Sequence, residues 1–220
     1  MCGRYYYDDT IAEEIAETVA EIDRRNLRQR SGDIHPSELA PVLCGTEASG
    51  NIYPSEWEPV LCEMKDTAGS YRRQSSVSAC RMRWGFSQRQ KSSLLINARA
   101  ETALQRPMFC DAVLHRRCVI PARHFYEWDA EKNKVTFSRE SGRALYLAGF
   151  YSRFGEEERF VILTTQANGS VRAVHHRMPL ILNENEWQEW IYNEQFLSDA
   201  LKKTPDKLKA YREYEQQSLF

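Results

Sequence analysis

The chain has 220 residues, of which 42% are hydrophobic and 28% charged, and its formal net charge is -1. This length suffices to bury a core as one unit, so we expect residues 1–220 to form a single domain. Because the sequence has no apolar run of the roughly 18 residues that a membrane helix needs, and residues 1–20 are acidic where a secretory signal would be basic, we expect a cytoplasmic, intracellular protein without a membrane partner.

The N-terminal part begins with Met-Cys-Gly-Arg and then predicts one helix. Over residues 10–30, Thr10 and Glu13 have the spacing of a capping box. One helical stripe collects the apolar residues Ile11, Ile15, Val19 and Ile22. The next segments, 46–57 and 64–76, are rich in Gly, Ser, Thr and charge, which is typical of surface loops.

Short β-like runs dominate the rest of the chain. They occur at residues 77–84, 117–121, 134–138, 144–151, 159–165 and 178–182. Helical patterns return at 185–192 and near 195–203. Strands that alternate irregularly with helices, with neither a regular βαβ rhythm nor a Gly-rich phosphate loop, predict an α+β fold. We expect a mainly antiparallel, barrel-like sheet flanked by helices.

The cysteines and histidines do not have the spacing of a metal site. No CxxC pair occurs among Cys2, Cys44, Cys62, Cys80, Cys110 and Cys118. His175 and His176 are adjacent and lack the i, i+4 spacing of a metal-binding helix. We therefore expect mostly buried thiols, no metal, no cofactor and a monomer.

Charge is distributed unevenly along the chain. Between Asp66 and Glu101 there is no acidic residue, whereas this window contains Arg72, Arg73, Arg81, Arg83, Arg89, Lys91 and Arg99. Such a window indicates either a phosphate-binding face or a solvated basic face without a partner. Aromatic residues lie among these bases (Tyr71, Trp84 and Phe86), which favours single-stranded nucleic acid, because unpaired bases stack on aromatic rings.

Four short stretches carry candidate chemistry: MCGR at 1–4, LINARAET at 95–102, FYEW at 125–128 and VHHRMP at 174–179. Each has an ordinary structural interpretation when taken alone. Asn97 suits a turn or cap, and His175 suits a hydrogen-bonded structural histidine. Glu127, between two aromatic residues, must be either outward-facing or buried and perturbed.

Together, in this order and at these intervals, the four stretches resemble the SRAP family, the SOS-response-associated peptidases, from Cys2 to about Leu182. The resemblance implies a DNA-damage-response protein that recognises abasic sites in single-stranded DNA, crosslinks to them and shields the lesion. It also implies a possible auto-processing peptidase activity and a DNA lyase-type activity.

By the same resemblance, Cys2 is the nucleophile and Asn97, Glu127 and His175 line the site. Arg4 and Arg99 hold flanking phosphates, and we add Trp84 as a further DNA-binding residue. Removal of Met1 would give Cys2 a free α-amine, whose ordinary pKa is about 7.7–8.0. The amine can form an imine with the sugar aldehyde, and the thiol of the same residue can then close a thiazolidine ring.

Two features depart from the family pattern. The second tryptophan that often follows the Trp-Gly pair is missing after Trp84, which puts a stacking wedge there in doubt. The turn Asp33–Pro36 begins with an aspartate where an asparagine is usual. Since a carboxylate repels phosphate, we expect this turn to lie back from the DNA backbone.

The sequence leaves three alternatives open. An N-terminal Met-Cys-Gly also begins glutamine amidotransferases of the N-terminal-nucleophile class, in which the amine serves as the base for its own thiol. A peptidase that uses Cys2 is the second alternative. The third is a module that binds single-stranded DNA without a covalent bond.

Overall fold

The computed structural model describes residues 2–19, 22–46, 76–88 and 91–212. Except for their ends at 46 and 76, the loops predicted at 46–57 and 64–76 lie outside these residues. The predicted basic window is also described only in part, because Arg72, Arg73 and Arg89 fall outside.

The structure consists mainly of short strands. These are β1 (Tyr5–Tyr7), β2 (Gly32–Ile34), β3 (Leu39–Thr46), β4 (Ser76–Trp84), β5 (Phe86–Gln88), β6 (Lys91–Leu95), β7 (Asn97–Arg99), β8 (Arg117–Ala122), β9 (His124–Trp128), β10 (Lys134–Ser138), β11 (Leu145–Phe154), β12 (Glu157–Gln166), β13 (Arg177–Pro179), β14 (Ile181–Leu182) and β15 (Lys209–Arg212). The helices are α1 (Asp9–Thr18), α2 (Arg24–Leu27), α3 (Pro107–His115), α4 (Trp187–Tyr192), α5 (Glu194–Lys202) and the 3-10 helix η1 (Ala100–Gln105).

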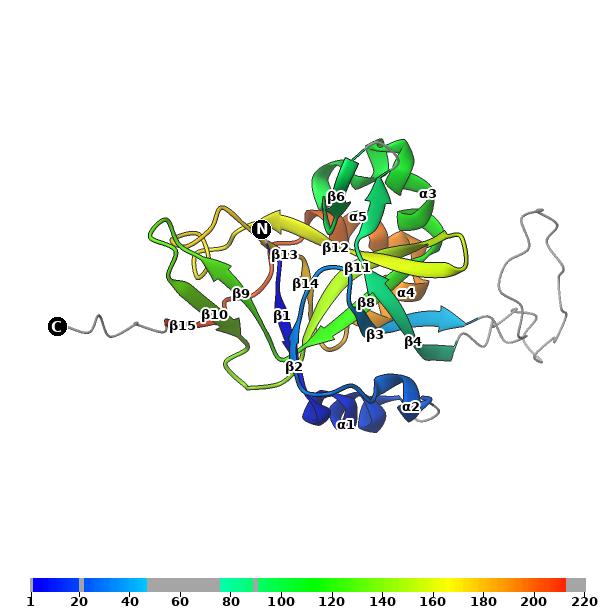
Figure 1. Cartoon of the computed structure of the whole chain (residues 1–220), viewed down its shortest axis with the longest axis horizontal. Helices are drawn as coiled ribbons and strands as arrows, with labels where there is room; N and C mark the ends of the chain where they lie inside the picture. The colour runs from blue at the N-terminus through cyan, green and yellow to red at the C-terminus, as the bar shows by residue number, and fades with distance from the viewer. Residues whose placement is uncertain (1, 20–21, 47–75, 89–90, 213–220) are drawn as a thin grey trace, which may run out of the picture.

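Five of the strands close into a barrel. The order β12, β4, β3, β8 and β11 returns to β12, because β11 also pairs with β12. The pairing of β12 with β4 is parallel, and the other four pairings around the ring are antiparallel. Helices lie against this barrel, with α3, α4 and α5 on one side in Figure 1. The predicted α+β fold with a mainly antiparallel, barrel-like sheet is confirmed.

A second sheet has the order β15, β10, β9, β1 and β2. Its strand β1 pairs with β9 through Tyr5 and Phe125, so the N-terminal strand lies beside the strand that contains the FYEW stretch. In Figure 1, β1 (blue) runs between β9 and the barrel. The N-terminal strand therefore belongs to the second sheet and lies next to the barrel.

The burial of each strand follows from its residue pattern. All six residues of β8 are buried, and residues 118–122 form the apolar run expected of a strand covered on both faces. Strand β10 instead alternates buried and partly exposed residues, because one face of the second sheet meets water. A Cβ added at Gly149 of β11 would lie 2.5 Å from Ile120 Cδ1 and 2.7 Å from the Val161 carbonyl oxygen, so this barrel position requires glycine.

Two predicted elements are divided in the structure. The helix predicted over 10–30 is two helices, α1 and α2, and Asp8 rather than Thr10 caps the first, because its side chain accepts a 3.2 Å hydrogen bond from the Ile11 amide. The strand predicted at 178–182 is β13 and β14, separated by Leu180. Leu180 donates to Leu163 of β12 and accepts from Ala148 of β11, 2.8 Å in each case, so the chain changes its partner strand there.

Candidate active site

Cys2 lies in the segment that leads into β1 and is fully buried. Its thiol donates a 3.6 Å hydrogen bond to the Arg4 carbonyl oxygen. Burial raises the pKa of this thiol far above its ordinary value, and the negative charge of Glu127 raises it further. The sulfur is therefore a neutral thiol near pH 7, not a thiolate.

Asn97 contacts the same residue from the barrel side. It begins β7, which pairs in parallel with β12 and places Asn97 opposite Ile162. The Asn97 side-chain amide donates a 2.8 Å hydrogen bond to the Cys2 carbonyl oxygen. The amide oxygen Oδ1 is buried and accepts no hydrogen bond within the part of the chain that the structure describes. Asn97 thus holds the backbone of Cys2 and keeps a buried acceptor at the same place.

Glu127 comes from β9 and is 3% exposed. Burial raises the pKa of its carboxyl group from an ordinary value near 4.5 to about 7, and the positive charge of the chain's amino terminus opposes that shift. At neutral pH, both protonation states of Glu127 are therefore populated, which is the condition for a group that both takes and gives protons.

His175 lies just before β13 and is half-buried. Its Nδ1 lies 3.0 Å from the Arg177 amide nitrogen and 3.1 Å from the Arg177 carbonyl oxygen, so the Arg177 backbone engages Nδ1 in either tautomer. The ring stacks on His176 with a centroid separation of 4.4 Å. Burial lowers the pKa of His175 below its ordinary value, and the charge of the amino terminus adds to this effect. His175 is therefore mostly neutral at pH 7.

Two interactions bring three of these groups together at Cys2. The negative charge of Glu127 acts on the pKa of the Cys2 thiol, and charge effects fall off with distance. Asn97, 95 residues away along the chain, touches Cys2 directly. Cys2, Asn97 and Glu127 therefore come from three distant segments to one place, and the membership of His175 in this site stays a prediction.

Comparison with known proteins shows the family. The family model described as SOS response associated peptidase (SRAP) matches residues 1–217. The chain belongs to the SRAP family.

Curated relatives of this SRAP chain have names that refer to DNA lesions. It is 33% identical over 106 residues to "Abasic site processing protein YoaM" of Bacillus subtilis, covering 44% of this chain and 47% of the relative. It is also 33% identical over 107 residues to "Abasic site processing protein YedK" of Escherichia coli, covering 46% and 48%. The chain thus spans about half the length of the curated relatives it matches.

Solved structures share the SRAP fold. A crystal structure of a protein from Bordetella bronchiseptica has a TM-score of 0.71 and 21% identity, covering 97% of this chain and all of that one. A second, from Bacteroides thetaiotaomicron, has a TM-score of 0.69 and 20% identity, covering 96% and 91%. At this level of identity, the likeness concerns the fold alone.

An ion pair between a buried arginine and an exposed glutamate, which the sequence analysis missed, joins two of the quoted motifs. Arg177 is 6% exposed and donates to both carboxylate oxygens of Glu101, at 2.7 and 2.9 Å. It also donates to the Thr164 carbonyl oxygen at 2.6 Å. Because Glu101 follows Asn97 and Arg177 follows His175, the pair fixes the two motif segments to each other. The signal was present, since both residues lie in quoted stretches, but their contact cannot be read from spacing.

The two predicted phosphate-binding arginines differ in their surroundings. Arg99 is exposed at the end of β7. The guanidinium carbon of Arg4 lies 5.2 Å from the Trp128 ring centre, and its Nη1 lies 3.5 Å from the Asp33 carboxylate. Asp33 is thus adjacent to a predicted DNA contact. The expectation that its turn lies back from the DNA backbone stays a prediction.

The prediction that Trp84 contacts DNA is wrong. Trp84 is fully buried, and its ring centre lies 5.3 Å from that of Tyr5 and 6.2 Å from that of Phe160. Its indole nitrogen donates a 2.9 Å hydrogen bond to the Ile96 carbonyl oxygen. A ring enclosed in the core cannot stack on a base, so Trp84 instead supports the residue that precedes Asn97.

The predicted basic window does not form one free basic face where it is described. Arg81 donates to the Arg28 carbonyl oxygen and to Gln29, and Arg83 forms an ion pair of 3.1 Å with Glu157.

Within the described ranges, no group of three or more potential metal-ligating residues occurs, and no helix is long and apolar enough to cross a membrane.

Proposed function

We propose that this SRAP protein processes abasic sites in single-stranded DNA by forming a covalent bond between Cys2 and the open sugar aldehyde, which shields the lesion. The observation that carries the proposal is the 2.8 Å hydrogen bond of Asn97 to Cys2, which fixes this residue beside a buried carboxyl group of pKa about 7. The names of the curated relatives support abasic DNA as the substrate.

The first step needs the α-amine of Cys2, and therefore removal of Met1. The amine nitrogen attacks the aldehyde carbon, the carbonyl electrons move to oxygen, and transfer of one proton from nitrogen to that oxygen gives a carbinolamine. Glu127 then takes the second proton from nitrogen and returns it to the hydroxyl group, which leaves as water and yields the imine. A carboxyl group with a pKa of about 7 suits both transfers, and such a group contributes about 10²–10⁴-fold to the rate.

The second step uses the thiol of the same residue. The Cys2 sulfur adds to the imine carbon, the carbon–nitrogen π electrons move to nitrogen, and the thiol proton follows them. Closing a five-membered ring within one residue benefits from a high effective molarity. Since burial keeps the thiol protonated, we expect the amine to attack first.

His175 assists before either step by opening the closed sugar. Its Nδ1 is engaged by the Arg177 backbone, which leaves Nε2 as the nitrogen that exchanges a proton with the sugar. Asn97 orients the reacting hydroxyl or amine through its buried amide oxygen. Arg4 and Arg99 hold the phosphates that flank the lesion.

The atom that attacks separates this proposal from its rivals. A glutamine amidotransferase or a peptidase would attack through the sulfur, with the α-amine as its base, whereas the proposed reaction begins with the amine. A non-covalent module would make no use of a carboxyl group of pKa about 7 beside the nucleophile. The proposed reaction uses the amine, the thiol and the carboxyl group together.

The proposal is tested with trimmed protein and a labelled single strand that contains one abasic site. We expect a protein–DNA band that resists heat and detergent. The matched strand, in which borohydride has reduced the aldehyde to an alcohol, should give no band, and neither should protein that retains Met1. If mass spectrometry shows complete trimming and no band forms, the covalent mechanism is wrong.

Cys2→Ser distinguishes the two steps. Its α-amine still forms an imine, which borohydride traps, but the hydroxyl group does not close a stable thiazolidine. We therefore expect a band with Cys2→Ser only when borohydride is present. Equal yields of detergent-resistant adduct from Cys2→Ser and parent without borohydride would contradict the ring-closing role of sulfur.

A further inference from the structure

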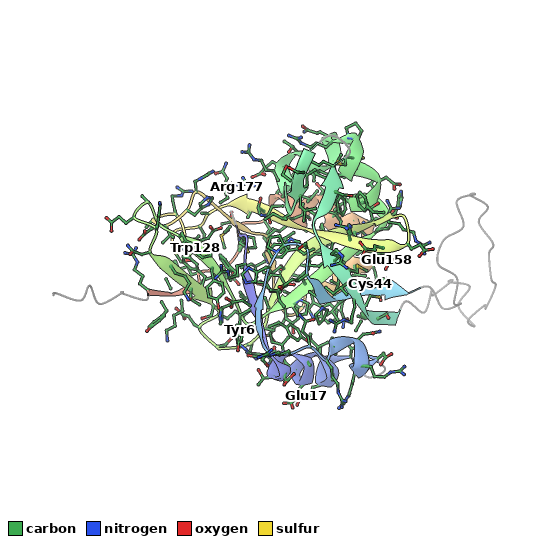
Figure 2. The ribbon with its side chains drawn as sticks, in the orientation of Figure 1. Tyr6, Glu17, Cys44, Trp128, Glu158 and Arg177 are labelled. Atoms are coloured by element: carbon green, nitrogen blue, oxygen red, sulfur yellow. The ribbon has the colours of Figure 1, made fainter. Side chains whose placement is uncertain are left out.

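A pair of thiols lies in the barrel wall, away from the Cys2 site. Cys44 is on β3 and Cys80 on β4, which pair antiparallel with Val42 opposite Cys80 and Cys44 opposite Ser78. The two cysteines are thus diagonal neighbours, and their sulfur atoms are 2.9 Å apart. In Figure 2, Cys44 and Glu158 lie at one side of the molecule, while Trp128 and Arg177 lie toward the other.

The geometry of this pair is close to that of a bond. A disulfide has a sulfur–sulfur distance of about 2.03–2.05 Å, so the two atoms need to approach by less than about 1 Å. Both cysteines are on paired barrel strands, so the strand register holds their backbones beside each other. Both are free thiols in the structure.

The two thiols are not equivalent. Cys44 is 3% exposed, whereas Cys80 is half-buried and so more accessible to a small oxidant. Either sulfur can donate the hydrogen bond between them, and this bond lowers the pKa of the Cys80 thiol and raises that of Cys44. Ser78 acts in the same direction on Cys80, while burial and the charge of Glu158 act against it. Cys80 is therefore the sulfur that reacts first.

We propose that Cys44 and Cys80 are a redox modification site that forms a reversible intramolecular disulfide when the protein meets a peroxide. The Cys80 sulfur attacks one peroxide oxygen, the oxygen–oxygen bond breaks, and the departing hydroxide takes the Cys80 proton and leaves as water, so that Cys80 becomes a sulfenic acid. The Cys44 sulfur then attacks Cys80, the sulfur–oxygen bond breaks, and a second water leaves with the Cys44 proton. Two thiols lose two electrons, and one peroxide is reduced to two waters. A dithiol reductant restores the thiols.

The bond would have a measurable effect on stability. It would link residues separated by 36 positions in the chain, which restricts the unfolded state. For a chain of this size, we expect the midpoint of thermal unfolding to rise by on the order of 5–10 °C after oxidation. The rise should disappear on addition of dithiothreitol.

The experiment treats the full chain with hydrogen peroxide and maps its peptides without reduction. We expect a peptide pair that contains Cys44 and Cys80 and has lost two hydrogens, together with the rise in the unfolding midpoint. Cys80→Ser should abolish both. The matched control is Cys110→Ser, which replaces a half-buried cysteine on α3 and should leave both unchanged.

Two results would overturn the proposal. One is oxidation of Cys80 to sulfinic acid while Cys44 stays reduced. The other is a bond from either residue to another cysteine, such as Cys62. If Cys80→Ser does not fold, Cys44→Ala provides the same test, since Cys80 should then accumulate as sulfenic acid that a dimedone probe captures. No such capture would contradict the order of attack. The proposal does not depend on DNA crosslinking, so either can fail alone.

Discussion

The two faces of strand β9 contact different parts of the molecule. Its inward residues, Phe125 and Glu127, are buried, and Glu127 faces the Cys2 site. On the outer face, the Tyr126 hydroxyl donates a 2.8 Å hydrogen bond to Asp33, and Trp128 lies under the Arg4 guanidinium. Because side chains alternate along a strand, the proposed function assigns proton transfer to the inner face and DNA binding to the outer face of one five-residue segment. The comparison teaches that changes on the two faces should alter different measured quantities.

The largest effect should come from the inner face. Glu127→Gln removes the proton-transferring group but keeps its size, so we expect crosslinking to slow by about 10²-fold or more. Binding to intact single-stranded DNA should be nearly unchanged. Quench-flow crosslinking and fluorescence anisotropy measure the two quantities separately.

Tyr126→Phe is the matched control from the outer face. It removes one hydroxyl group from the neighbouring residue, and the crosslinking rate should change by less than about 3-fold. If Tyr126→Phe slowed crosslinking as much as Glu127→Gln, the division between the faces would be lost.

The same inner-face variant should change the pH dependence of stability. Burial raises the pKa of Glu127, so the folded protein holds this proton more tightly than the unfolded chain does, and stability is lost as pH rises from about 4.5 to 7. The Glu127→Gln variant has no titrating group at this position, so it does not lose this stability. We expect it to be more stable than the parent by roughly 3 kcal/mol above pH 7 and equal to it below about pH 4.5. Urea unfolding at both pH values measures this difference, and a variant that is less stable at pH 8 would contradict it.

On the outer face, Arg4→Ala should weaken binding to intact and abasic strands by the same factor. Losing one phosphate contact should reduce the slope of log affinity against log salt by about 0.7 for a single strand. Once the DNA is bound, the rate of crosslinking should stay near that of the parent. Arg99→Ala is expected to behave alike. Unchanged salt slopes in both variants would place the phosphate contacts elsewhere.

The smallest effect should come from Asp33→Asn, which restores the usual residue of the family pattern. It removes the carboxylate 3.5 Å from Arg4, and with it a competitor for the DNA phosphate. Since both side chains are about one-third exposed, the pair is worth about 0.2–1 kcal/mol, which corresponds to at most about 5-fold tighter binding to either strand. Weaker binding would mean that Asp33 positions Arg4 rather than competes for it.

The sequence predicted the barrel because its strands are long enough to show a pattern. The runs at 117–121, 144–151 and 159–165 all fall on barrel strands. Three-residue strands such as β1 and β7 have no detectable period, so they were missed. The helix over 10–30 was over-extended because the apolar stripe continues past the end of α1, although Val19 adopts an extended conformation.

The candidate site was predictable as residue types but not as geometry. Cys2, Asn97, Glu127 and His175 were named from four short motifs, and the structure places Asn97 on Cys2. Trp84 failed because an aromatic residue among basic ones looks the same in sequence whether its ring is buried or exposed. Contacts between distant segments, such as the sulfur pair Cys44 and Cys80, depend on strand register, which composition does not reveal.

Leu180, where the chain changes its partner strand, has a consequence for how long the side chains of the site keep their positions. Leu180 is fully buried and is hydrogen-bonded to both β11 and β12, so its amide can exchange with solvent only when the barrel itself opens. His175 lies five residues before this point, and Arg177 between them is held by Glu101. The segment between His175 and Leu180 is therefore held at both ends. The position of the His175 imidazole should persist for as long as the barrel stays closed, and slow amide exchange at Leu180 would report that time.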